Sequence, residues 1–187
     1  MKRRGLAMAL AVASWIALTA TGQGQQAAQL AVQPAAKPTL GVVVIRPVGG
    51  AKVRGNLRLV QNGSVLRITG RINNLTPGHH EFRAHQYGDS RSRTGDSAGG
   101  EFWIAEAKRE DGAGDEVRFN GDLGRIDAAD NGVAVVDVTL EVVSLSDLIG
   151  RGLVVHGPPA NTNEVRVGIG VVGIGNPTWR WPLDPKR

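Results

Sequence analysis

Histidine and cysteine are the side chains that most often bind metals or act as nucleophiles and proton carriers, and this chain uses them unevenly. It has four histidines and no cysteine in 187 residues. The histidines are His79, His80, His85 and His156. Imidazole nitrogens bind copper readily, whereas the lack of cysteine excludes a disulfide, a thiolate metal site and a cysteine nucleophile. A copper site in this chain would therefore draw its nitrogen ligands from these histidines.

The elements that would position the histidines are short β-branched segments bounded by Gly, Asn or Pro. They are Val42–Ile45, Val53–Gln61, Ser64–Ile72, His79–Tyr87, Val117–Leu123, Val133–Val143, Leu153–His156 and Arg166–Ile174. The pair Asn62-Gly63 between two alternating runs is a strong hairpin signal. Regular short strands with turn residues predict an all-β sandwich or barrel of eight strands without a helix. Two long connections, Gly88–Glu116 and Ser144–Gly152, separate some of these strands.

The charge balance becomes nearly neutral once the first residues are set aside. The chain has 22 Lys+Arg and 17 Asp+Glu. Without Lys2, Arg3 and Arg4, 19 basic residues face 17 acidic ones, which leaves a net charge near +2. No block of like charges occurs in the sequence. We therefore expect no nucleic acid or other polyanion as a partner.

The first residues have the organisation of a secretory signal. The basic residues Lys2, Arg3 and Arg4 precede an apolar run, Leu6–Leu18, and small residues follow at Ala20–Gly22. The apolar run is shorter than the ~20 residues that a membrane span needs. We therefore expect residues 1–22 to be a cleaved signal peptide. The protein would be exported, periplasmic or secreted, with no membrane span after cleavage.

The remainder divides by composition. Residues 23–39 are rich in Gln, Ala and Pro and predict a flexible linker. The β segments occupy 40–175, and residues 176–187 form a C-terminal tail. Trp179 and Trp181 share a face if this tail is extended. We expect them to cap one end of the domain.

Several motifs occur in one order between about Leu40 and Gly175. They are GHHEFRAHQYGD at 78–89, SAGGEF at 97–102, GDLG at 121–124, IGRGLVVH at 149–156, and Arg166 followed by GVVGI at 170–174. In order and spacing they resemble the signatures of the Cu,Zn superoxide dismutase family. The resemblance implies an eight-stranded antiparallel Greek-key barrel with two long loops.

The resemblance also implies four histidine positions around copper, and only two of them hold histidine here. These are His85 and His156, while Arg83 and Glu101 stand at the other two. Arginine is always protonated and cannot donate a lone pair to a metal. It would also put a fixed positive charge where a dication should sit. A rearranged copper site could recruit His79 or His80 as additional ligands, although the resemblance gives His80 only a supporting role between neighbouring strands.

The implied zinc site has lost more of its ligands. The aspartate ligand corresponds to Asp122, whereas Arg109 and Phe119 stand at two histidine positions. Zinc takes N, S or O ligands, which neither of these two side chains supplies. We therefore expect no zinc site and no firmly bound cofactor, with copper as an alternative. Arg166 corresponds to the arginine that guides superoxide to copper, and it would serve catalysis if the chain is active.

Two functions follow from these substitutions. The first is an exported, non-catalytic domain on the dismutase barrel that acts as a binding or structural module. The alternative is a divergent copper-dependent dismutase, which converts superoxide to oxygen and hydrogen peroxide, or a copper-binding protein using His85 and His156. A protein partner or a homodimer is left open.

The substituted positions also predict two ion pairs. Because Arg83 and Glu101 replace ligands of one metal ion, their side chains should meet and form a pair in its place. Arg109, or its neighbour Lys108, should pair with Asp122 and hold the long loop against the barrel.

Overall fold

The computed structural model describes residues 37–105, 117–157 and 165–179. The predicted signal and most of the predicted linker lie outside these residues, as do Arg109 and Trp181. Among the helices in the described part of the chain, none is long and apolar enough to cross a membrane.

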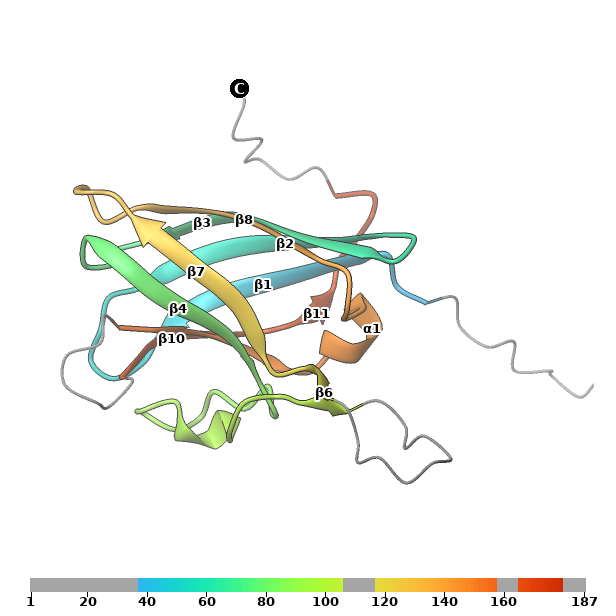
Figure 1. Cartoon of the computed structure of the whole chain (residues 1–187). Helices are drawn as coiled ribbons and strands as arrows, with labels where there is room; N and C mark the ends of the chain where they lie inside the picture. The colour runs from blue at the N-terminus through green and yellow to red at the C-terminus, as the bar shows by residue number, and fades with distance from the viewer. Residues whose placement is uncertain (1–36, 106–116, 158–164, 180–187) are drawn as a thin grey trace, which may run out of the picture. The chain divides into compact units, whose positions relative to one another are not determined.

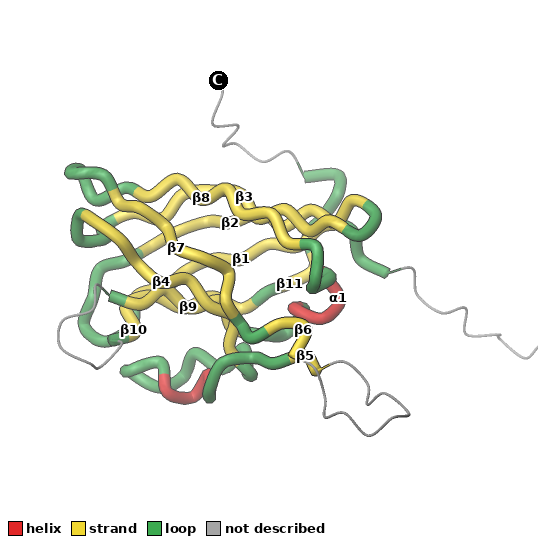
Figure 2. The backbone as a smooth tube through the Cα atoms, in the orientation of Figure 1, coloured by secondary structure: helices red, strands yellow, loops and turns green. Residues whose placement is uncertain are grey.

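Eight antiparallel strands form a closed barrel (Figures 1 and 2). They are β1 (Leu40–Pro47), β2 (Arg54–Asn62), β3 (Val65–Asn73), β4 (Gly78–His85), β7 (Asp122–Ala128), β8 (Ala134–Leu140), β9 (Gly152–His156) and β10 (Arg166–Val171). Their order around the barrel is β1-β2-β3-β8-β7-β4-β9-β10, and β10 pairs back with β1. Since β3 lies beside β8 and not beside β4, the order is that of a Greek key. The predicted eight-stranded antiparallel barrel is confirmed.

The predicted strand Val117–Leu123 is wrong in its extent. β6 (Val117–Phe119) pairs with β5 (Ile104–Ala105) in a separate two-stranded sheet, and the barrel strand β7 begins only at Asp122. The turn between them uses Gly121 at a φ of 80°, a left-handed conformation that suits glycine. The carbonyl of Gly121 then accepts the amide of Ala84 at 2.7 Å, which joins this turn to β4.

The structure also contains helical turns where the sequence pattern predicts none. Leu145–Leu148 form the short helix α1, and Asp96–Ala98 form a 3-10 turn. α1 begins with a capping box, in which the Ser144 side chain accepts from the Asp147 backbone and the Asp147 carboxylate accepts from the Ser144 amide at 2.9 Å. The Ser144 hydroxyl also donates to this carboxylate at 2.6 Å. Its buried Leu145 and Leu148 join the barrel core.

Alternation along the strands fills the barrel with aliphatic side chains. The most deeply buried of these include Ile45, Leu57, Leu59, Leu66, Ile68, Ile72, Phe82, Leu123 and Leu153. The predicted β2–β3 hairpin is confirmed, but its two-residue loop is Gly63-Ser64, because Asn62 pairs with Val65. Gly70 lies opposite Leu57, and a Cβ on it would come within 2.2 Å of the Asn56 carbonyl oxygen. Only glycine fits there.

The C-terminal end of the described chain lies against β1 on the outside of the barrel. β11 (Gly173–Ile174) extends the pairing of β1 after a break that follows β10. Trp179 is 69% exposed and lines a groove with Ile174 on the outside of the barrel. The expectation that Trp179 caps the domain is therefore wrong, because its indole remains largely in solvent.

Candidate functional site

The outer side of β4 is covered by residues 86–102, which we call the covering segment. Glu101 forms an antiparallel bridge with His85, and the amide of Phe102 donates to the carbonyl of Ala84 at 2.9 Å. The segment thus returns along the end of β4. This path places Glu101 beside Arg83, 18 residues earlier in the chain.

A small apolar cluster and one arginine hold the covering segment on the barrel. Ala98 packs outside the barrel in a buried cluster with Val48, Val154 and Ile169. The Arg166 guanidinium donates to the carbonyls of Gly95 and Gly99 at 2.6 and 2.7 Å. The residue that the resemblance links to superoxide guidance is therefore engaged with backbone here.

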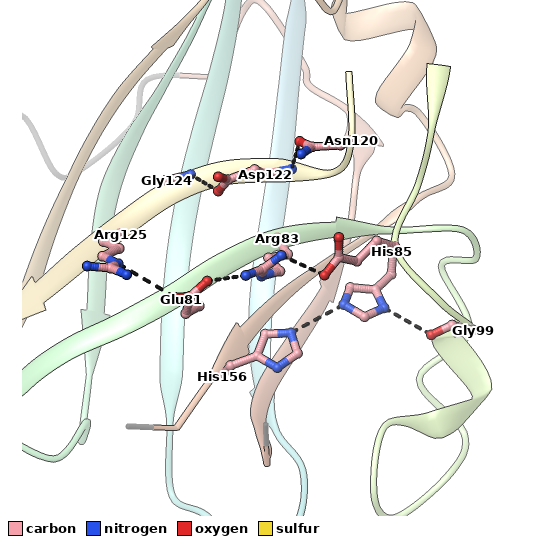
Figure 3. Close-up of polar contacts among 10 residues, drawn as sticks. Glu81, Arg83, His85, Gly99, Asn120, Asp122, Gly124, Arg125 and His156 are labelled. Atoms are coloured by element: carbon pink, nitrogen blue, oxygen red, sulfur yellow. Dashed lines mark hydrogen bonds and ion pairs between the residues drawn. The ribbon is translucent and has the colours of Figure 1, made fainter. Parts of the chain in front are cut away.

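Two buried imidazoles meet beneath the covering segment. His85 and His156 are 2% and 3% exposed, and their rings stack with centroids 5.5 Å apart (Figure 3). Their Nε2 atoms lie 3.3 Å from each other. Because His85 Nδ1 lies 3.0 Å from the carbonyl oxygen of Gly99, Nδ1 must carry the proton that it donates. In the neutral pair, His85 Nε2 is then the acceptor and His156 Nε2 the donor.

The environment of the pair disfavours the charged form of His85. Burial lowers the pKa of its imidazole, and the nearby guanidiniums of Arg166 and Arg83 lower it further. The Gly99 carbonyl and the Glu101 carboxylate oppose this shift. Burial has the largest influence, so the site favours the neutral form of the His85 imidazole.

The predicted ion pair between Arg83 and Glu101 is confirmed. Arg83 Nη1 donates to Glu101 Oε1 at 2.6 Å, with the side chains 19% and 29% exposed. Arg83 Nη2 donates to Glu81 on its other side, and Glu81 Oε1 lies 3.6 Å from Arg125 Nε (Figure 3). Four side chains of alternating charge thus form a row across β4, and Arg83 is neutralised from two sides.

The histidines that a rearranged copper site would recruit are not available to it. His80 Nδ1 lies 2.8 Å from the carbonyl oxygen of His156, and His80 Nε2 lies 2.8 Å from that of Thr76. With both nitrogens engaged, His80 connects β4 to β9. His79 is largely exposed and contacts Asp127 across the β4–β7 pair.

Of the three residues at the implied zinc site, Asp122 is the one whose side chain the structure describes. The exposed Asp122 accepts the amide of Gly124 at 2.8 Å. The backbone of Phe119 pairs with Ile104 in the separate small sheet. Since Arg109 lies outside the described residues, its pairing with Asp122 stays a prediction.

The donor set does not fit a complete copper or zinc site. Metal–nitrogen bonds of about 2.0–2.1 Å would let two nitrogens at this spacing share one ion. In the described parts of the chain, however, no group of three His, Cys, Asp or Glu side chains could hold a metal. Glu101, which forms a β-bridge with His85, has its carboxylate bonded to Arg83. What remains is a two-imidazole pair.

Sequence reasoning missed Glu81 as the second partner of Arg83. A usable signal was present, because residues i and i+2 of a strand share a face, which puts Glu81 beside Arg83. No sequence pattern indicates the role of Gly99. Its carbonyl accepts from both His85 and Arg166, which depends on how the covering segment folds.

Comparisons with known proteins agree with the barrel fold. Residues 53–174 match the family of copper/zinc superoxide dismutases. An extracellular Cu-Zn superoxide dismutase of Onchocerca volvulus is 38% identical over 134 residues, which cover 69% of this chain and 63% of the relative. The extracellular enzyme of Brugia pahangi is 34% identical over 137 residues, covering 72% and 66%. The matched part thus spans about two thirds of the length of these relatives.

A third relative is covered more completely. A superoxide dismutase [Cu-Zn] of Onchocerca volvulus is 33% identical over 137 residues, which make up 71% of this chain and 82% of the relative. The barrel, the matched motifs and these relatives lead to one conclusion: the chain belongs to the copper/zinc superoxide dismutase family.

Proposed function

We propose that this protein is an exported, non-catalytic member of the family that serves as a binding or structural domain. The observation that carries the proposal is the 2.6 Å contact between Arg83 Nη1 and Glu101 Oε1. It places an ion pair at two positions that the resemblance assigns to copper ligands. The pair joins β4 to the covering segment, which is the structural task that a bridging metal ligand would otherwise perform.

The chemistry of the residues supports the loss of activity. Superoxide dismutation needs a metal that cycles between two oxidation states in an open nitrogen site. Arg83 offers no lone pair and keeps its charge at every physiological pH. A second cation placed beside it in a half-buried site would be repelled. The two remaining imidazoles are too few donors for the family's site.

The test is elemental analysis of the purified mature protein after growth with added copper and zinc, followed by a dismutase assay of the copper-loaded protein. We expect less than one tightly bound copper per chain and activity at background. A double variant, Arg83→His with Glu101→His, restores the family's residues and should gain copper affinity. Its matched control, Arg83→Gln with Glu101→Gln, removes the same charges without adding imidazoles and should not.

Strong dismutase activity of the unmodified protein, abolished by His85→Ala, would refute the proposal. So would copper coordinated by Glu101 in a crystal structure of the loaded protein.

A second candidate, copper binding without dismutation, is favoured by one observation. The Nε2 atoms of His85 and His156 face each other at 3.3 Å, within the range for two ligands of one ion. Titration against a copper chelator tests it. Binding that is lost in both His85→Ala and His156→Ala, together with background dismutase activity, would support this candidate over the enzyme.

Export is the remaining part of the proposal. It is supported by the signal-like residues 1–22 and by the extracellular relatives in the comparisons. N-terminal sequencing of the protein recovered from the culture medium or the periplasm checks it. We expect the mature chain to begin near residue 23, whereas an intact Met1 in the cytoplasmic fraction would contradict export.

A further inference from the structure

The outward faces of β1, β2, β3 and β8 form a continuous surface on which arginine is the dominant charged residue. The structure describes all four strands, and their outward positions include Arg46, Arg54, Arg58, Arg67 and Arg71. The one acidic residue among these positions is Asp137 of β8. Five arginines against one aspartate give this surface, which we call the arginine face, a net charge of +4.

The strand register arranges four of these arginines in a line. Arg71 lies opposite Asn56 and Arg67 lies opposite Val60. Positions 54 and 58 of β2 are arginines, and positions 56 and 60 lie beside arginines of β3. Arginines from the two strands therefore alternate along one line. Successive steps of two residues are about 6.6–6.8 Å each, so the line is about 20 Å long.

Most of these arginines have no acidic partner among the described residues. Arg67 is held by Asp137 through Nε and Nη2, at 2.8 and 2.6 Å. Within the described parts of the chain, Arg54, Arg58 and Arg71 make no ion pair, and all three are exposed. The arginine face therefore carries a local excess of positive charge, although the whole chain without its first basic residues has a net charge near only +2.

An apolar groove borders this line of arginines. It has a volume of about 360 Å³ and is lined by Val44, Ile174 and Trp179, with Asn56 and Arg58 on its other side. Ile174 and Trp179 are each 69% exposed, and Val44 is 52% exposed. An exposed indole beside a guanidinium offers a flat apolar surface and an anion-binding group next to each other.

We propose that the arginine face and its groove bind a linear acidic polysaccharide. Guanidinium groups bond carboxylate and sulfate groups in a two-pronged manner. The indole of Trp179 stacks on the apolar face of a sugar ring, while the line of arginines follows the anionic groups along the polymer. The choice of a polysaccharide rests on the proposed export, since such polymers occur outside cells, and on the groove. An anionic lipid surface would supply charge but no ring to stack.

This proposal departs from the expectation that no polyanion binds. That expectation rested on a net charge near +2 and on the absence of a block of like charges in the sequence. Alternation in a strand separates same-face residues by one position, so Arg54 and Arg58, or Arg67 and Arg71, never form a run.

The experiment measures binding of the mature protein to sodium polygalacturonate and to heparin, at low and high salt, with neutral dextran as a blank. We expect binding to both acidic polymers that weakens with salt. Each arginine near an anionic surface contributes about fivefold to the affinity. The variant Arg54→Gln/Arg71→Gln should therefore bind about thirtyfold more weakly. The matched control Arg91→Gln/Arg93→Gln removes equal charge outside the arginine face and should lose less than about threefold.

A further variant separates a sugar from other anions. Trp179→Ala should weaken polymer binding about two- to tenfold and leave binding to phosphatidylglycerol vesicles unchanged. Equal losses in the test and control pairs would overturn the proposal, because net charge alone would then explain binding. No effect of Trp179→Ala on either polymer would overturn it as well, and vesicle binding as strong as polymer binding would reassign the face to lipid. Circular dichroism of each variant checks that the barrel is intact.

Discussion

Arginine occupies two contrasting regions of this barrel. Beneath the covering segment, Arg83 is 19% exposed and bonds Glu81 and Glu101. On the arginine face, Arg54 and Arg71 are exposed and make no ion pair within the described structure. The difference lies in solvation. A charge that loses water requires a partner within the fold, whereas water solvates an exposed charge and leaves it available to a ligand.

The two regions are also built differently. The arginine face follows from strand alternation and the pairing of neighbouring strands. The Arg83 site needs the covering segment to return along β4, with His85 and Arg166 bonding the same carbonyl of Gly99. A substitution on the arginine face should therefore alter ligand binding, and a substitution at the Arg83 site should alter the stability of the fold.

The sharpest test of this contrast is a double-mutant cycle on Arg83 and Glu101. A fully buried pair loses about 3–5 kcal/mol when one partner is removed and an exposed pair about 0–1 kcal/mol. At 19% and 29% exposure, we expect Arg83→Ala and Glu101→Ala each to lower the free energy of unfolding by about 1–3 kcal/mol. The double variant should cost less than the sum.

Urea unfolding of the four proteins in this cycle measures the coupling. Arg83→Ala should cost more than Glu101→Ala, because it also leaves Glu81 without this partner. Strictly additive effects would show that the two side chains do not depend on each other.

A smaller effect is expected from acid. Since burial lowers the pKa of folded His85 below its ordinary 6.5, the unfolded chain takes up this proton at a higher pH than the folded chain. The stabilising contribution is complete above about pH 6.5 and decreases as the pH falls through that value. Unfolding at pH 7.5 and pH 5 should show this loss, and His85→Gln should reduce it.

A pH dependence that His85→Gln does not change would assign the acid sensitivity to other groups.

Smaller still is the contribution of the ion pair on the arginine face. Arg67 and Asp137 form a two-pronged contact but are 56% and 52% exposed. We expect a coupling energy well below that of Arg83 and Glu101 from a double-mutant cycle with alanine, decreasing in high salt. A coupling as large as that of Arg83 and Glu101 would remove the contrast between the two regions.

The smallest effect concerns the unpaired arginines. Arg54→Gln should change the free energy of unfolding by less than about 0.5 kcal/mol, although the arginine face is proposed to lose ligand affinity with it. A thermal melt of this single variant is sufficient. A clear loss of stability would mean that Arg54 supports the barrel.

Much of the fold was accessible from the sequence, because local patterns determine it. Alternating apolar residues and the Asn62-Gly63 turn predicted the β2–β3 hairpin, and the ordered motifs predicted the Greek-key barrel. The start of β7 was missed, because the turn at Gly121 separates β6 from β7 within a run that looks continuous. α1 was missed because its capping box spans only Ser144 to Asp147 and the helix has four residues.

The candidate site was predictable to the extent that the family resemblance places residues around one point. The resemblance predicted the contact between Arg83 and Glu101. The structure adds Glu81 as a further partner of Arg83 and the Gly99 carbonyl as a partner of His85. The sequence also could not show that both nitrogens of His80 lie 2.8 Å from backbone carbonyl oxygens, because those carbonyls belong to Thr76 and to His156 of β9.

By itself, the sequence determined that the chain is a β barrel of this family and that two of its implied copper positions hold opposite charges. The alternation of residues along each strand, the order of the motifs and the residue types at the substituted positions are sufficient for those conclusions. The tertiary structure decided which charges are desolvated and paired, and that arginines from two strands form one line. Both depend on strand register and on the path of the covering segment, which bring together residues that are distant in the chain. Desolvation acts on that three-dimensional neighbourhood and not on the order of residues.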